Sequence, residues 1–216
     1  MNNSSYPIGT PGEKWNNNNK IQWLEAQKIK RSYQQDVVTL IDELKSTLEV
    51  QQYGELNYAA GSSLQSEGAE YDLLQFHFHS PSEHTLNGKS FPLEVHFVHK
   101  AQDGTLAVVG VMFEEGAENA ELAKIWKDMP KAANDVTTSD VTVNAGNLLP
   151  VDQTVIRYAG SLTTPPCSEG VKWHVMTSPI EVSKEQVEKF LSTVPANNRP
   201  LQPLNDRSFK THKHSH

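Results

Sequence analysis

The chain is poor in cysteine and in long apolar runs. Its 216 residues include one cysteine, Cys167, so no disulfide can form within the chain. No run approaches the ~18 apolar residues of a membrane-spanning helix, so none is predicted. The first residues, MNNSSYPIGTPG, have neither a basic region nor an apolar core, and we expect no signal peptide. A mature chain whose leader had been removed would look the same, which leaves the compartment open.

Basic residues are also outnumbered. The formal net charge is −7 and no long basic block occurs, which argues against nucleic acid and anionic membranes as partners. Apolar residues make up 37% of the chain and the mean hydropathy is −0.56, values typical of a soluble globular protein. The length suits one domain, or at most two small ones, with a proper core.

Histidine, in contrast, is concentrated. Five of the nine histidines lie between residues 75 and 100, in two runs that alternate as strands do. Side chains two apart in a strand point the same way. His77 and His79 therefore share a face with Gln75, and His96 shares a face with Glu94 on a second strand.

This pattern predicts a metal site. Three neutral imidazoles leave the fourth position of a tetrahedral Zn²⁺ open, as a catalytic zinc requires, and Gln75 and Glu94 are placed to accept ring N–H groups and fix the tautomers. The alternative is that these are buried histidines with ordinary partners. The pair on one strand, the third histidine on another and the carboxylate two residues before it favour the metal.

The rest of the chain from about residue 55 is rich in short strand patterns, so a mostly β fold is predicted. Residues 22–48 have helical periodicity, residues 131–153 are loop-like, and the tail 208–216 is polar and ends THKHSH, typical of a solvated tail. Asn87-Gly88 indicates a tight turn. The strongest strands are expected at 73–78, 93–98 and 106–113, and further strands at 154–158 and 171–176. Further helices are expected at 117–129 and 183–194, the last capped by Ser183.

Four motifs also carry a family resemblance. FHFHSPSEH, EVHFVHK, GSLTTPPCSEGVKWHV and NNRPLQPLN follow one another in the chain, and together they resemble the α-class carbonic anhydrases from about Gly54 to Arg207. The resemblance implies a single domain over 1–216 built on a large, twisted, mainly antiparallel central sheet with peripheral helices. Residues 1–53 would be a divergent segment, 54–207 the catalytic part and 208–216 a tail.

The implied function is zinc-dependent, reversible hydration of carbon dioxide to bicarbonate and a proton through a zinc-bound hydroxide. By resemblance, His77, His79 and His96 are the Zn²⁺ ligands. Their hydrogen-bond partners would be Gln75, Glu94 and the backbone of Asn197, in that family's arrangement. Thr163 would accept from the hydroxide and donate to Glu83, because an acceptor-only carboxylate takes the one proton of the threonine hydroxyl.

The resemblance also implies roles for other residues, a class of inhibitors, an oligomeric state and a compartment. His84 and His99 match buried histidines that do not bind metal. Sulfonamides and anions are expected as inhibitors, the chain as monomer or homodimer, and the compartment as periplasmic or secreted. The residues that match the wall of the carbon dioxide pocket are Val98, Val108, Leu162, Thr164, Val171 and Trp173.

The N-terminal segment departs from the family pattern. The position of the histidine that moves protons to solvent falls at about Gln52, whose amide cannot titrate, and no histidine precedes His77. Cys167 stands where secreted members carry half of a disulfide, so a free thiol or a pair between chains is expected. Either this segment has been replaced or the encoded one is not native. The alternative functions are therefore an impaired or non-catalytic, carbonic anhydrase-related binding protein, or a chain that folds poorly.

Overall fold

A computed structural model describes residues 48–50, 56–57, 62–130, 137–139 and 142–213. The chain divides into two compact units, one formed by residues 1–45 and 162–168 and the other by residues 46–161 and 169–216. The second unit holds all the helices and strands of the described residues. In the first unit, residues 162–168 form a loop in which the Leu162 amide donates to the Ser168 carbonyl at 3.0 Å and the Cys167 amide to the Thr164 carbonyl at 2.9 Å.

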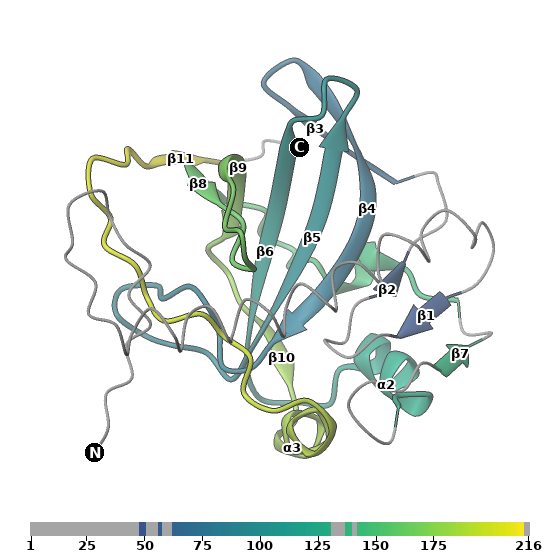
Figure 1. Cartoon of the computed structure of the whole chain (residues 1–216). Helices are drawn as coiled ribbons and strands as arrows, with labels where there is room; N and C mark the ends of the chain where they lie inside the picture. The colour runs from purple at the N-terminus through teal and green to yellow at the C-terminus, as the bar shows by residue number, and fades with distance from the viewer. Residues whose placement is uncertain (1–47, 51–55, 58–61, 131–136, 140–141, 214–216) are drawn as a thin grey trace, which may run out of the picture. The chain divides into compact units, whose positions relative to one another are not determined.

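The described strands form one mainly antiparallel sheet. Its order is β11-β8-β9-β6-β5-β4-β2-β1-β7, with β10 beside β6 and β3 beside β4. Only the pairings of β6 with β9 and with β10 are parallel among these strands. In Figure 1 the long strands β4, β5 and β6 run side by side. The strands are β1 (Leu48–Val50), β2 (Leu56–Asn57), β3 (Ser63–Ser66), β4 (Ala69–His79), β5 (Leu93–Ala101), β6 (Leu106–Glu115), β7 (Thr137–Ser139), β8 (Val155–Ser161), β9 (Glu169–Met176), β10 (Ile180–Val182) and β11 (Lys210–His212).

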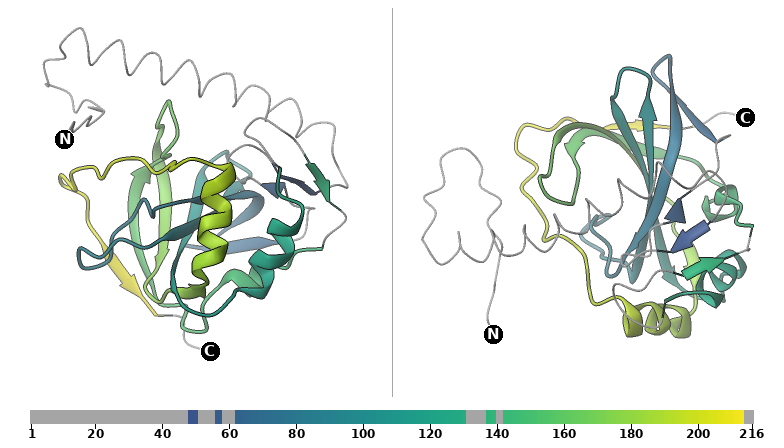
Figure 2. Two further views of the ribbon diagram at one scale, coloured as in Figure 1. Left: turned by 90° about the horizontal axis from the view of Figure 1, so that it is seen from below. Right: turned by 45° about the vertical axis from the view of Figure 1, so that its right-hand side comes forward.

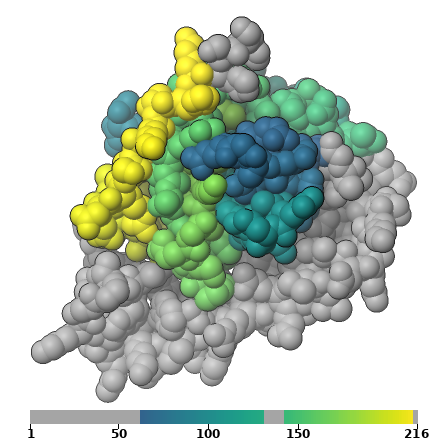
Figure 3. All heavy atoms as spheres, turned by 90° about the horizontal axis from the view of Figure 1, so that it is seen from above, coloured from purple at the N-terminus to yellow at the C-terminus, as the bar shows by residue number. Residues whose placement is uncertain are grey.

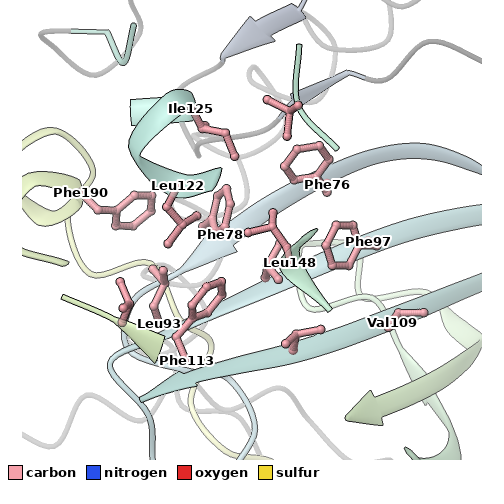
Figure 4. Packing of buried hydrophobic residues seen from close by; sticks show 14 of the residues in the cluster. Phe76, Phe78, Leu93, Phe97, Val109, Phe113, Leu122, Ile125, Leu148 and Phe190 are labelled. Carbon is pink, nitrogen blue, oxygen red and sulfur yellow. The ribbon is translucent and has the colours of Figure 1, made fainter. Parts of the chain in front are cut away.

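The hydrophobic core lies on one face of this sheet. Phe76 and Phe78 of β4 are fully buried, and they pack with residues of helices α2 (Ala120–Lys127) and α3 (Lys184–Thr193). Figure 4 shows Leu122 and Phe190 beside Phe78, and Figure 2 shows the two helices next to each other. Because alternate side chains of a strand point to opposite faces, the histidines of β4 are left on the other face.

Both helices begin where their sequences provide a cap. The Asn119 side chain accepts from the amides of Glu121 and Leu122 at 3.1 Å, which starts α2. Ser183 is the N-cap of α3, as the sequence predicts, and it forms a reciprocal capping box with Gln186. No helix in the described ranges is long and apolar enough to span a membrane.

The predicted fold class is confirmed, and most of the predicted elements that fall on described residues are present. The helix expected over 22–48 lies outside the described residues except Leu48, which begins strand β1. Residues 131–153 contain strand β7 and a 3-10 helix, Ala145–Leu148. The tail contains strand β11, whose backbone pairs with β8; in Figure 3 the C-terminal residues, in yellow, run along one side of the described part of the chain. The domain boundaries stay a prediction.

Candidate metal centre

Strand pairing brings the three predicted histidines together. His77 on β4 is the register partner of His96 on β5, and His79 pairs with Glu94. Register partners in an antiparallel pair project to the same face. The ring centroids of His77 and His79 lie 4.9 Å apart, and those of His79 and His96 lie 4.6 Å apart. The alternation predicted for both strands is confirmed.

Each of these imidazoles has one ring nitrogen bonded to an acceptor outside the cluster. His77 Nδ1 donates to Gln75 Oε1 at 2.8 Å, and His96 Nε2 donates to Glu94 Oε1 at 2.8 Å. His79 Nδ1 lies 3.3 Å from the Asn197 carbonyl oxygen. A neutral imidazole that donates through one nitrogen carries a lone pair on the other. The three acceptors therefore select the tautomers that a metal ion needs.

The cluster fits a zinc ion by its donors and by its burial. One ring nitrogen from each of the three histidines lies within 4.8 Å of the others. Burial and the neighbouring rings of His79 and His96 hold the pKa of His77 well below its usual range, so this imidazole is neutral at pH 7. Three neutral imidazoles are a known donor set for catalytic zinc.

Glu94 is the most heavily bonded polar group at the centre. Its side chain is fully buried. Oε2 accepts from the amides of Glu83 and His84 at 2.8 and 2.9 Å, and Oε1 accepts from the rings of His84 and His96 at 2.6 and 2.8 Å. Burial alone would raise the pKa of Glu94, but His84 and His96 outweigh it and lower the pKa well below the usual range. His84, Glu94 and His96 also lie close enough to hold a metal, but a metal there would displace these bonds.

His84 extends this network to the next strands. Its Nε2 lies 2.7 Å from the Tyr158 hydroxyl on β8, and its ring lies 4.8 Å from the ring of Trp173 on β9. Burial lowers the pKa of His84, but the Glu94 carboxylate outweighs burial and raises it. His84 is thus a partner of Glu94. His99 is also buried, and its Nδ1 donates to the Phe97 carbonyl at 2.9 Å.

Sequence reasoning missed the side chain of Asn197. Its Nδ2 donates to the Phe78 carbonyl and its Oδ1 accepts from the Ser80 amide, both at 2.9 Å. These bonds fix a distant segment against the end of β4, with the Asn197 carbonyl next to His79. The Asn-Asn-Arg-Pro motif was the available signal, because an amide side chain bonds a carbonyl and an amide at once.

Glu83 lies beside the histidines. It is 8% exposed, and its Oε1 accepts from the Arg199 amide at 2.6 Å and lies 3.4 Å from His79 Nδ1. Thr163, its predicted partner, belongs to the loop 162–168 of the other unit. The pairing of Thr163 with Glu83 therefore stays a prediction.

Four of the six predicted pocket residues lie on the histidine face of the sheet. Val98 pairs with Val108, and Val108 pairs with Trp173. These side chains and Val171 are buried but do not belong to the core cluster on the opposite face. Their role as a pocket wall stays a prediction. Leu162 and Thr164 lie in the other unit, and Gln52 lies outside the described residues.

Comparison with known proteins agrees with this geometry. The model of the eukaryotic-type carbonic anhydrase family matches residues 4–213. A carbonic anhydrase of Pectobacterium carotovorum is 46% identical over 154 residues, which cover 71% of this chain and 63% of that protein. One from Nostoc is also 46% identical, over 71% of this chain and 58% of that protein. The chain thus matches less than two thirds of the length of these relatives.

Two solved structures of similar fold are also named carbonic anhydrases. The α-carbonic anhydrase of Thermovibrio ammonificans, in complex with sulfanilamide, is similar with a TM-score of 0.73 and 43% identity, over 76% of this chain and 74% of that one. A carbonic anhydrase of Chlamydomonas reinhardtii in complex with acetazolamide has a TM-score of 0.71 and 37% identity, over 77% and 78% of the two chains.

Proposed function

The chain belongs to the eukaryotic-type carbonic anhydrase family, and from that premise we propose that it hydrates carbon dioxide reversibly to bicarbonate and a proton with a zinc ion held by His77, His79 and His96. The observation that carries the proposal is the convergence of these three imidazoles, with His79 and His96 buried and His77 half-buried, and with one ring nitrogen of each within 4.8 Å of the others. Zinc bound by three neutral imidazoles activates a water molecule for attack on carbon dioxide, the chemistry for which carbonic anhydrases are the standard example.

The protein's part is to orient the three ligands and to keep His77 neutral. Gln75, Glu94 and the Asn197 carbonyl each accept from one histidine, which fixes the tautomer and the plane of the ring. Burial of His77 keeps its nitrogen from taking a proton that would compete with the metal.

The substrate side is apolar. Val98, Val108, Val171 and Trp173 supply a buried apolar wall on the face that carries the histidines. Such a wall excludes competing water and suits a small molecule without charge. We propose that carbon dioxide lies against it.

We propose that the Thr163 hydroxyl donates its proton in a hydrogen bond to the Glu83 carboxylate. An ionised Glu83 can only accept, so it would take the proton of the Thr163 hydroxyl, whose oxygen then accepts from the attacking water. The attacking lone pair is thereby aimed at the substrate. By family membership, sulfonamides are proposed to bind at the same centre, since two related structures hold one.

The test is stopped-flow hydration of carbon dioxide with zinc content measured on the same sample. We expect about one zinc per unaltered chain. His96→Ala should lose both the hydration activity and the bound zinc, because two imidazoles do not complete the site. His99→Ala is the matched control: this buried histidine lies three residues along the same strand and should retain zinc. One zinc per chain without hydration would favour a non-catalytic relative; no zinc would favour disrupted folding.

A further inference from the structure

A glycine stands at the centre of the sheet, directly opposite a proposed metal ligand. Gly110 lies in β6 between two other strands, and its register partner on β5 is His96. Its φ is not in the left-handed region, so the backbone does not require glycine there. Glycine weakens a strand interior, and where it occurs it often marks a close approach by another group.

The approaching group is the carboxylate of Glu94. A Cβ added at Gly110 would lie 3.0 Å from Glu94 Oε1, 3.7 Å from Trp173 Cζ3 and 3.8 Å from His96 Cδ2. The first distance is tighter than an ordinary van der Waals contact, and either the oxygen or the strand would have to move. Glu94 Oε1 is the atom that accepts from His96 Nε2.

Glu94 has little freedom to withdraw. Its two oxygens are held by four hydrogen bonds, from the amides of Glu83 and His84 and from the rings of His84 and His96. Any shift of Oε1 away from residue 110 strains the bonds to both rings. The displacement would therefore pass to the orientation of the His96 imidazole, the third proposed zinc ligand.

We propose that Gly110 is a positioning residue of the metal centre: the absence of a side chain there makes the space in which the Glu94 carboxylate orients His96. This inference rests on the proposed function for its effect on zinc, whereas its effect on the rings does not depend on metal. An unhindered Gly→Ala change in a strand interior would stabilise the protein by reducing the freedom of the unfolded chain. Gly110→Ala is instead expected to destabilise the protein.

The test compares Gly110→Ala with the unaltered chain by zinc competition against a chelator. We expect zinc affinity to fall about 10–100-fold, which is the range found when a partner of a metal ligand is disturbed. In a Glu94→Ala background the same Gly110→Ala change should alter affinity less than about threefold, because the obstructed carboxylate is gone. An unchanged affinity in the single variant, or an equal loss in both backgrounds, would overturn the proposal.

Val111→Ala is the control for plain destabilisation. Val111 is the next residue of β6, is fully buried and packs in the core on the opposite face. It should lower thermal stability but leave zinc affinity unchanged. If Val111→Ala weakens zinc as much as Gly110→Ala does, the effect is general and the proposal fails.

A second readout uses metal-free protein, so that it is independent of the proposed function. Long-range ¹H–¹⁵N spectra of the rings should show His96 protonated at Nε2 in the unaltered chain. Gly110→Ala should shift the His96 and His84 signals and leave those of His99 in place. Unmoved His96 and His84 signals would contradict the proposal, whether or not the unaltered chain takes up zinc.

Discussion

Replacing His174 should change how the stability of the fold depends on pH. His174 lies on β9, is 4% exposed and has its Nε2 2.8 Å from Ser66 Oγ, which links the tip of the β3–β4 hairpin to β9. Burial, and then the charge of its register partner Arg157, lower the pKa of His174 to about 4. A hydrogen bond with the backbone of Lys172 and, after it, the charge of Glu67 act in the opposite direction but do not outweigh these two causes.

The sign follows from the proton balance. Above pH ~6.5 the imidazole is neutral in both states and makes no contribution. As the pH falls below that value, the unfolded chain binds a proton that folded His174 does not, so the free energy of unfolding falls until the pH reaches about 4. With these two pKa values the loss is about 2 kcal/mol at pH 5.

Urea unfolding of chelator-treated His174→Gln at pH 7.5 and pH 5 measures this directly. The variant loses a good contact with Ser66, about 1 kcal/mol, but no longer titrates. It should therefore be about 1 kcal/mol less stable than the unaltered chain at pH 7.5 and about 1 kcal/mol more stable at pH 5. Other groups that titrate in this range, such as His77, contribute equally to both proteins.

Ser66→Ala is the matched control, because it loses the same hydrogen bond and keeps the imidazole. It should lie below the unaltered chain by a similar amount at both pH values. Parallel pH profiles for His174→Gln and the unaltered chain would refute the reasoning.

Three further predictions concern the centre. Glu94→Gln should lower zinc affinity about 10–100-fold, as is found for partners of metal ligands, and should lower the free energy of unfolding by about 2–3 kcal/mol because buried donors lose an acceptor. Gln75→Ala should also weaken zinc binding, but with a smaller loss of stability. Chelator competition measures the affinities and urea unfolding the stabilities, and equal stability losses in the two variants would contradict this prediction. Thr163→Val should keep zinc but reduce turnover by about 10²-fold, measured by stopped flow; unchanged kinetics would exclude its pairing with Glu83. Since Gln52 cannot titrate, the maximal rate should rise with imidazole buffer concentration at fixed pH and ionic strength, and a rate that is already high and flat would show another proton path.

The sequence predicts well those features that follow from alternation along one strand. The period of two in β4 and β5 separates Phe76 and Phe78 from His77 and His79, and the structure places the two pairs on opposite faces. The second strand and its carboxylate follow from the same rule, so the local geometry of the centre was predictable.

Features that depend on contacts between distant segments were not predictable from the residues alone. Asn197 bonds to Ser80, 117 positions earlier, and no periodicity marks this. The reason for a glycine at position 110 is the Glu94 carboxylate on the neighbouring strand, whose Oε1 lies only 3.0 Å from where a Cβ would be. Strands of three residues, such as β10 and β11, are too short to display a period, and their pairing is decided by the sheet edge they meet.

The central claim is that His77, His79 and His96 together hold one catalytic zinc. Titration of zinc into the metal-free chain, with carbon dioxide hydration followed by stopped flow at each addition, tests it most directly. We expect the rate to rise in proportion to added zinc and to stop rising at one equivalent per chain. Binding of one equivalent of zinc without any hydration activity would contradict this claim, and so would the absence of both zinc binding and activity.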